Sequence, residues 1–412
     1  MKTYDVVIIG GGPAGLAAAV KLKESGIDQI LIIEREKQLG GILRQCIHDG
    51  FGLTRFGESL SGPEYSQRFI DLVEKYKIPY ITNATVIRLT RDKEITADTT
   101  KGLLVVKARA VILTMGCRER TRGALAIPGT RPSGIYTAGV AQSYINLQNI
   151  MVGREVIIMG SGDIGMIMAR RLTLEGAHVK AVFEVLPYPS GLPRNIEQCL
   201  NDYHIPLYLS HSVIQIHGTK RVEGVTVAEL DQNGKQIPGS EKFYSCDTLI
   251  LSVGLIPENE LSIDAGVALD ARTKGAFVDE NYQTGVPGIF AAGNVLHVHD
   301  LVDFVSQEAE RLSAGVVEYL QKDGLPECPL HVTGDSCVGH VLPQKVSGKK
   351  DFLLSMRVRR PLGRSRITVM QGEHVVKSVS MPKLIPAQMV QFPVPCTQMN
   401  EVEDLKVEVH EE

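Results

Sequence analysis

The stretch from Asp5 to Glu34 constrains the fold more than any other part of the chain. An apolar, β-branched run leads into a G-x-G-x-x-G turn at residues 10–15, and an Ala/Leu-rich helical stretch then runs to Gly26. A second apolar run ends on Glu34. The three glycines of such a turn permit the tight bend, the approach of backbone N–H groups to a pyrophosphate, and close helix–strand packing. An acid at the end of the next strand can accept hydrogen bonds from ribose hydroxyls, so this stretch predicts a dinucleotide site.

The same pattern occurs a second time. An apolar run enters the turn 160–165, Gly-Ser-Gly-Asp-Ile-Gly, and a helical stretch follows to Gly176 before a strand that ends on Glu184. In both copies the stop glycine lies 16 residues after the first glycine of the turn, and the acid lies 24 residues after that same first glycine. Two matching units are hard to obtain by chance, so we predict two dinucleotide sites rather than two glycine-rich turns without a ligand.

Composition excludes several classes of protein. The 412-residue chain has a net charge of -3 and an estimated pI of 6.4, which gives no nucleic-acid surface. No apolar run is long enough to span a bilayer, and the chain enters a strand at once, so we expect no signal peptide and no transmembrane segment. Seven scattered cysteines form no C-x-x-C pair, which favours thiols in a reducing cytoplasm.

The order of the remaining elements indicates a divided first domain. Both dinucleotide units close with a buried strand, 110–113 and 248–251, and strands 84–90, 95–99 and 103–107 are expected to form an antiparallel insertion. The helix expected at 301–320 completes the first domain, and short strands dominate thereafter. We therefore predict an α/β fold with two Rossmann-like three-layer domains and a small C-terminal all-β domain. The expected parts are a first FAD-domain part at 1–120, an inserted NAD domain at 121–254, a second FAD-domain part at 255–325, and the β domain at 326–412.

These motifs resemble the pyridine nucleotide-disulfide oxidoreductase superfamily over roughly residues 1–325. The carriers are the paired turns, the strand endings 114–116 and 252–254, and the segment 288–294. The resemblance implies FAD in the N-terminal domain and a nicotinamide nucleotide in the inserted one. The usual acid after the last FAD-side glycine is Asn294 here. The residues expected at FAD are Gly10, Gly12, Pro13, Ala14, Gly15, Glu34, Arg35, Gly41, Val86, Thr114, Gly116, Gly293 and Asn294; those at NAD are Gly160, Gly162, Asp163, Ile164, Gly165, Glu184 and Gly254.

A closer resemblance rests on segments 127–129, 134–139 and 298–303. They are similar to the FAD subunits of amine and opine oxidases and hydrogen cyanide synthase, and to flavoproteins accompanying anaerobic glycerol-3-phosphate dehydrogenase-like proteins. The implied function is hydride or electron transfer between NAD(H) and FAD as a subunit of a dehydrogenase system acting on glycerol 3-phosphate, amines or amino acids. Some longer relatives carry four C-terminal cysteines for an iron–sulfur cluster. Only Cys328, Cys337 and Cys396 occur here, so we predict no cluster.

Candidate catalytic groups are few. Cys46 follows the second glycine-rich segment, and Arg44 and His48 could lower its pKa, which would suit a stand-alone NADH oxidase or peroxidase. A buried structural thiol is the favoured interpretation, and a non-catalytic flavin-binding redox sensor is a further alternative. His297 and His299 would point the same way in an extended segment. No carboxylate or cysteine cluster at ligand spacing accompanies them, so we predict no metal and a structural pair or a hydrogen bond near the flavin.

Three further features have two interpretations each. Gln307 and Glu308, near the start of the last helix, could contact the flavin ring or belong to an ordinary helix surface. Glu184 would repel a 2′-phosphate and favour NAD(H) over NADP(H), unless it is only a solvated strand end. The C-terminal arginines would form a solvated face or a docking face for a partner subunit or a second copy, making 326–412 an interaction module. They are Arg357, Arg359, Arg360, Arg364 and Arg366.

Overall fold

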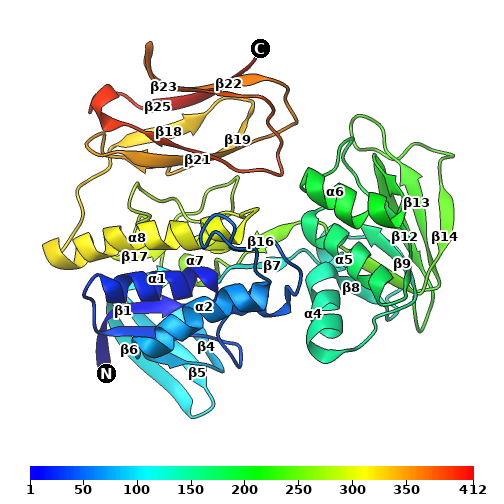
Figure 1. Ribbon diagram of the computed structural model, residues 1–412, viewed down its shortest axis with the longest axis horizontal. Coiled ribbons are helices and arrows are strands. Elements are labelled where there is room, and N and C mark those ends of the chain that lie inside the picture. Colours follow the sequence, from blue (N-terminus) through cyan, green and yellow to red (C-terminus); the bar gives the residue numbers. More distant parts are fainter. The chain divides into compact units, whose positions relative to one another are not determined.

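The computed structural model describes residues 1–412 and divides the chain into two compact units. One unit comprises residues 1–117 and 257–412, and the other comprises residues 118–256. The inserted unit therefore interrupts the first one, and the C-terminal strands belong to the first unit (Figure 1). No helix is both long and apolar enough to cross a bilayer.

The first unit is built on a sheet of seven strands in which buried parallel strands lie at the centre. Its path is β3-β2-β1-β6-β5-β4, and β17 pairs with the end of β6. Apolar runs in β1, β2 and β6 are fully buried, and helices α1 and α8 pack together over the sheet (Figure 1). The elements are β1 (Lys2–Ile9), α1 (Pro13–Glu24), β2 (Ile30–Ile33), α2 (Gly62–Lys75), β3 (Tyr80–Ile81), β4 (Ala84–Leu89), β5 (Glu94–Thr99), β6 (Gly102–Leu113), β17 (Ile289–Ala291) and α8 (Val302–Lys322).

Strand β6 replaces the two strands that the sequence predicted at 103–107 and 110–113. Its first half pairs with β5 in an antiparallel hairpin and alternates in exposure, whereas its second half runs parallel to β1 and β17 and is buried on both faces. The two halves thus carry different hydrophobic patterns within one continuous strand, which is why the sequence analysis separated them.

The second unit repeats the parallel arrangement. Its main sheet has the order β11-β10-β9-β15-β8, and all of its pairs are parallel. A separate antiparallel sheet of β12, β13 and β14 packs against part of the same core. The elements are β8 (Ile135–Thr137), α4 (Ala138–Gln148), β9 (Glu155–Met159), α5 (Asp163–Leu174), β10 (His178–Phe183), α6 (Pro193–Cys199), β11 (Leu207–Tyr208), β12 (His211–His217), β13 (Gly224–Glu229), β14 (Lys242–Ser245) and β15 (Thr248–Leu251).

The C-terminal segment folds into two β-sheets around its own core, so the predicted fold class is confirmed. The sheets have the orders β20-β18-β25-β22-β23 and β19-β21-β24. Pro393 lies in β24, an edge strand, where a missing backbone N–H is tolerated. The strands are β18 (Leu330–Gly334), β19 (Val338–Leu342), β20 (Lys345–Val346), β21 (Phe352–Val358), β22 (Ser365–Gln371), β23 (His374–Met381), β24 (Val390–Val394) and β25 (Leu405–Glu411).

Short elements complete the chain. They are η1 (Gly41–Gln45), β7 (Cys117–Glu119), α3 (Arg122–Leu125), η2 (Asn201–Tyr203), β16 (Leu255–Pro257), α7 (Glu260–Asp264), η3 (Gly293–Val295) and η4 (Cys396–Gln398).

The C-terminal sheets are bonded to the rest of the first unit rather than attached by a linker alone. The side-chain oxygen of Gln344 accepts a hydrogen bond from the Val278 backbone at 3.0 Å. The Ser347 backbone N–H donates to the Glu280 carboxylate at 2.9 Å. The C-terminal sheets are therefore packed as part of the first unit, and their role as an interaction module stays a prediction.

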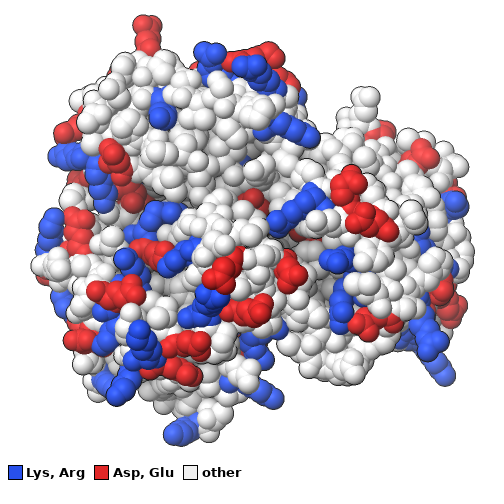
Figure 2. Space-filling model, in the orientation of Figure 1, with Lys and Arg blue, Asp and Glu red and all other residues white.

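The predicted basic face is wrong for Arg357, whose side chain is only 15% exposed and ion-paired with the buried Asp300 at 3.1 Å. The exposed arginines of the group also have acidic neighbours, since Arg364 and Arg366 both pair with Glu412. Figure 2 shows Lys and Arg interspersed with Asp and Glu over the visible face of the molecule. Charge complementarity at these arginines therefore offers little for docking.

Candidate functional site

The first glycine-rich turn is held by backbone contacts that only glycine permits. A Cβ on Gly15 would lie 1.9 Å from the carbonyl oxygen of Gly10, and one on Gly10 would lie 2.5 Å from the carbonyl oxygen of Thr114. Gly10 also has a φ of +106°, which L side chains rarely adopt. The Thr114 hydroxyl donates toward the carbonyl oxygens of Ile9 and Gly10 at 2.9 and 3.0 Å. The turn therefore brings the start of α1 close to the end of β6, as the fingerprint requires.

Glu34 closes this turn from the end of β2. It is 5% exposed, and its two oxygens accept hydrogen bonds from the backbone N–H groups of Gly11 at 2.6 Å and Glu36 at 2.8 Å. A carboxylate can accept about four hydrogen bonds, so roughly two acceptor positions remain for ribose hydroxyls. A Cβ on Gly41 would lie 2.9 Å from the Cα of Gly12, which places the second glycine-rich segment against the same turn. These residues fit an FAD.

Three predicted FAD residues lie farther from the turn or are engaged elsewhere. Arg35 is exposed and ion-pairs with Glu258 at 3.6 Å. Val86 is half-buried on β4, opposite Ala97. Gly116 has a φ of +72° where the chain turns after β6, and its carbonyl oxygen accepts a hydrogen bond from the Glu258 backbone at 3.1 Å. Their contacts with FAD remain predictions, as do those of Pro13 and Ala14 in the first turn of α1.

The second turn has the same construction, 150 residues further along the chain. A Cβ on Gly160 would lie 2.0 Å from the carbonyl oxygen of Ser252, and one on Gly165 would lie 2.7 Å from the carbonyl oxygen of Gly160. Gly254 follows with a φ of +100°. Gly162 begins the helix α5 with an extended backbone, and Ile164 is in its first turn.

Glu184 occupies the place of Glu34 and is 3% exposed, so it is not a solvated strand end. One of its oxygens accepts from the Ser161 backbone at 2.9 Å, the Ser161 hydroxyl at 2.6 Å and the Ser190 hydroxyl at 2.7 Å. The other accepts from the Leu186 backbone at 3.0 Å. A ribose hydroxyl at this carboxylate would thus replace one of the two serine hydroxyls, and a phosphate would meet a buried negative charge.

Sequence reasoning missed Gly191, the equivalent of the predicted FAD residue Gly41. Gly191 lies seven residues after Glu184, as Gly41 lies seven after Glu34, and a Cβ on Gly191 would lie 2.9 Å from the backbone nitrogen of Asp163. The equal spacing was the available signal. The Asp163 carboxylate itself accepts from the Leu192 backbone at 2.8 Å and the Asn195 side chain at 2.6 Å, so it positions the segment after Glu184.

A cavity of about 710 Å³ lies within the inserted unit. Its lining includes Thr137 and Leu251, the last residues of β8 and β15, together with Arg122 and Arg131. It therefore opens at the carboxyl ends of the parallel strands, which is where sheets of this kind bind their ligands. The two arginines give the cavity a basic lining.

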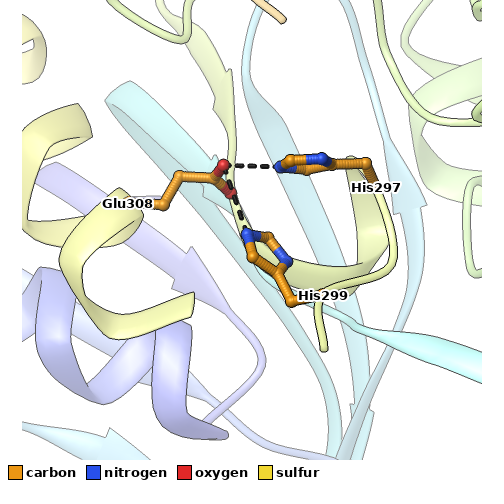
Figure 3. Close-up of side chains that lie close together, drawn as sticks. All are labelled: His297, His299 and Glu308. Atoms are coloured by element: carbon orange, nitrogen blue, oxygen red, sulfur yellow. Dashed lines mark hydrogen bonds and ion pairs between the residues drawn. The ribbon is translucent and has the colours of Figure 1, made fainter. Parts of the chain in front are cut away.

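The two histidines of the H-x-H segment meet Glu308, which comes from the first turns of α8 (Figure 3). Nε2 of His297 lies 2.7 Å from Oε2 of Glu308, and Nε2 of His299 lies 3.4 Å from the same oxygen. The three side chains are each 1% exposed. No carboxylate was expected beside the two histidines from the sequence, and that expectation was wrong, because Glu308 lies there. Glu308 is not on an ordinary helix surface, whereas the neighbouring Gln307 is half-buried.

Electrostatics in this cluster follow from burial and proximity. Burial lowers the pKa of His297 despite the attraction of Glu308. Burial alone would raise the pKa of Glu308, but the two histidines outweigh it and lower that pKa. The second oxygen of Glu308 accepts from the Gly293 backbone at 2.7 Å, and the Asn294 side-chain oxygen accepts from the His299 backbone at 3.0 Å. The cluster thus holds the short helix η3, where the predicted FAD residues Gly293 and Asn294 lie.

Cys46 lacks the low pKa of a reactive thiol. It follows η1 and is half-buried, and burial raises its pKa to about 12. The predicted lowering of this pKa by Arg44 and His48 is therefore wrong, and the structural thiol that the sequence favoured agrees better with the structure. At neutral pH this thiol is protonated.

The family model for pyridine nucleotide-disulphide oxidoreductases matches residues 4–312. An opine oxidase subunit of Agrobacterium tumefaciens is 27% identical over 323 residues, which cover 71% of this chain and 61% of that protein. Thioredoxin reductase of Listeria monocytogenes is 28% identical over 301 residues, covering 71% of this chain and 86% of that protein. The chain thus spans less than two thirds of the opine oxidase protein that it matches.

Among solved structures, thioredoxin reductase of T. acidophilum superposes with a TM-score of 0.63. The match covers 77% of this chain and 99% of that chain at 24% sequence identity. A likeness at this level of identity shows the fold.

Proposed function

Because the chain belongs to the pyridine nucleotide-disulphide oxidoreductase family, whose members are FAD-dependent NAD(P)H oxidoreductases, we propose that it is an electron-transfer subunit of a dehydrogenase system. Two complete dinucleotide units in one chain carry this proposal, because each ends in a buried carboxylate bonded to its own turn. Bound FAD and NAD(H) would supply hydride transfer. The residues of the chain bind the two nucleotides and hold their ribose and phosphate groups.

Delivery of electrons to a separate protein is favoured because the chain has no cysteine pair that could accept them from the flavin. The sequence has no C-x-x-C pair, and the thiol that follows the Gly41 segment, Cys46, is protonated with a pKa of about 12. Neither disulphide exchange nor thiolate chemistry is therefore supported at that turn. The similarity to a protein named as one subunit of opine oxidase points in the same direction. We propose a cytoplasmic location and a partner dehydrogenase subunit that acts on glycerol 3-phosphate, an amine or an amino acid.

An anaerobic titration tests the redox part of this proposal. The purified protein should be yellow, and NADH should bleach the flavin absorbance. Gly160→Ala is a suitable variant, because its Cβ would lie 2.0 Å from the Ser252 carbonyl oxygen. We expect this variant to keep FAD and to be reduced by dithionite but not by NADH. A flavin in the wild-type protein that NADH cannot bleach would contradict the proposal.

The choice between NADH and NADPH depends on Glu184. Its buried carboxylate would repel a 2′-phosphate, so we propose a preference for NADH. Steady-state rates with both nucleotides test this preference. Glu184→Gln should narrow the difference between the kcat/KM for NADH and that for NADPH. A lower KM for NADPH with the wild-type protein would refute the charge argument.

Purification of the tagged chain from its own cells, followed by identification of the co-purifying protein, tests the proposed partner subunit. Recovery of the chain alone would count against that partner.

A further inference from the structure

We propose that His297, His299 and Glu308 form a binding site for a single divalent transition-metal ion of the Zn²⁺ class. Two imidazoles and one carboxylate are a ligand set that proteins use for zinc and for non-haem iron. One potential ligand atom of each side chain lies within 4.8 Å of the other two. Figure 3 shows both imidazole rings directed at the carboxylate, with His297 and His299 on one loop and Glu308 on α8.

The orientation of the His299 ring is set by Asn294. The Asn294 side-chain atom that accepts the His299 backbone N–H at 3.0 Å must be its oxygen. Nδ1 of His299 lies 3.4 Å from the same oxygen, so Nδ1 is the ring nitrogen that donates toward Asn294. Nε2 is then the ring nitrogen that faces the Glu308 carboxylate, and a cation between Nε2 and the carboxylate would bind both groups.

The contact between His299 and Glu308 leaves room for an ion. Nε2 of His299 is buried and lies 3.4 Å from Oε2 of Glu308 without making a hydrogen bond to it. A charge-assisted N–H···O hydrogen bond is shorter, at about 2.8 Å. Around a tetrahedral zinc ion, nitrogen and oxygen ligands lie about 3.4 Å apart, given metal–ligand bonds of about 2.1 Å. The His297 pair, at 2.7 Å, would open by roughly 0.7 Å on binding the ion.

Two of the three ligands, Glu308 and His299, have the outer contacts that orient metal ligands, whereas Nδ1 of His297 is buried without a hydrogen-bond partner. Oε1 of Glu308 accepts the Gly293 N–H at 2.7 Å, and Nδ1 of His299 faces the Asn294 oxygen. Such contacts fix the rotamer and tautomer of ligands in known metal sites. His340, from β19, lies beside this group: its Nε2 is buried without a hydrogen-bond partner, and its ring centre lies 5.7 Å from that of His297. An ion held by His297, His299 and Glu308 would join α8 to the loop that follows η3.

The metal content of the flavin-loaded full-length protein provides the test. After growth in zinc-supplemented medium and desalting, we expect about one zinc ion per chain by mass spectrometry of the elements. His299→Asn and Glu308→Gln should reduce this to background. His374→Asn, which removes an exposed histidine on β23, should leave it unchanged. Zinc at background in the wild-type protein would overturn the proposal, and so would an equal zinc content in His299→Asn.

A thermal melt of the wild-type protein gives a second readout, with His299→Asn as its control. Treatment of the wild-type protein with 1,10-phenanthroline during mild warming should lower its Tm, and addition of ZnCl₂ alone should restore it. The His299→Asn protein should respond to neither addition. A wild-type Tm that is insensitive to both the chelator and zinc would also overturn the proposal.

Discussion

Replacement of Arg357 by methionine should destabilise the first unit far more than the loss of any exposed arginine. Arg357 donates hydrogen bonds to the Val298 carbonyl oxygen and the Asp300 carboxylate, each at 3.1 Å, and to the carbonyl oxygens of Pro386 and Ala387. It therefore joins strand β21 to the loop that follows η3. The side chain of Asp300 is only 4% exposed.

The magnitude follows from what the substitution leaves behind. Methionine keeps much of the volume of the stem, but Asp300 retains only the Met389 backbone N–H, at 3.3 Å, among its described hydrogen bonds. Removing one partner of a buried ion pair costs about 3–5 kcal/mol, because the other charge stays buried without compensation. Arg366 is the matched control. It is 58% exposed and pairs with Glu412 at 2.8 Å, and such surface pairs contribute about 0–1 kcal/mol.

Urea unfolding of the FAD-loaded protein, followed by the rise in flavin fluorescence on release, measures the difference. We expect Arg357→Met to lower the midpoint strongly and Arg366→Met to leave it nearly unchanged. Asp300→Asn and the double variant complete a thermodynamic cycle, and the double variant should be less destabilised than the sum of the two single variants. The reasoning is refuted if Arg357→Met and Arg366→Met behave alike, or if the two single effects are additive.

Three further predictions concern single groups. The thiol of Cys46, with its pKa of about 12, should react with iodoacetamide at pH 8 far more slowly than a model thiol, and Cys46→Ser should consume NADH at the wild-type rate; rapid labelling at Cys46 would contradict the first expectation. Burial raises the pKa of Asp279 to about 6 from a usual 3.8, so the folded state holds a proton that the unfolded chain has lost, and stability should fall as the pH rises through this range. Asp279→Asn should lack that fall in Tm between pH 4 and 7, and parallel curves would disprove it. Gly15→Ala, whose Cβ would lie 1.9 Å from the Gly10 carbonyl oxygen, should yield a colourless protein; a normal flavin absorbance would show that the turn can adjust.

The parts of the fold that the sequence predicts are those enforced by local sterics. The first turn is readable because a side chain at Gly15 would collide with the backbone of Gly10, so the pattern has little freedom. Glu34 and Glu184 can be predicted for a different reason, because each stands at the same distance along the chain from the first glycine of its turn. The fully buried β strands are visible as continuous apolar runs.

The contacts that sequence analysis missed join residues from different elements. Glu308 reaches the histidines across the gap between α8 and the loop before it, and Arg357 reaches Asp300 from a strand 57 positions away. A sequence shows the charges of the residues next to a cysteine, but it does not show how deeply the thiol is buried. The basic residues near Cys46 therefore suggested a reactive thiol, whereas desolvation decides its pKa.

The constant separation of 150 residues between the two turns makes each turn a reference for the other. Gly10 and Gly160, Gly15 and Gly165, and Glu34 and Glu184 all keep it. Positions at which the two turns differ can therefore be compared within one chain. They include Gly11 and Ser161, Pro13 and Asp163, and Gly40 and Ser190.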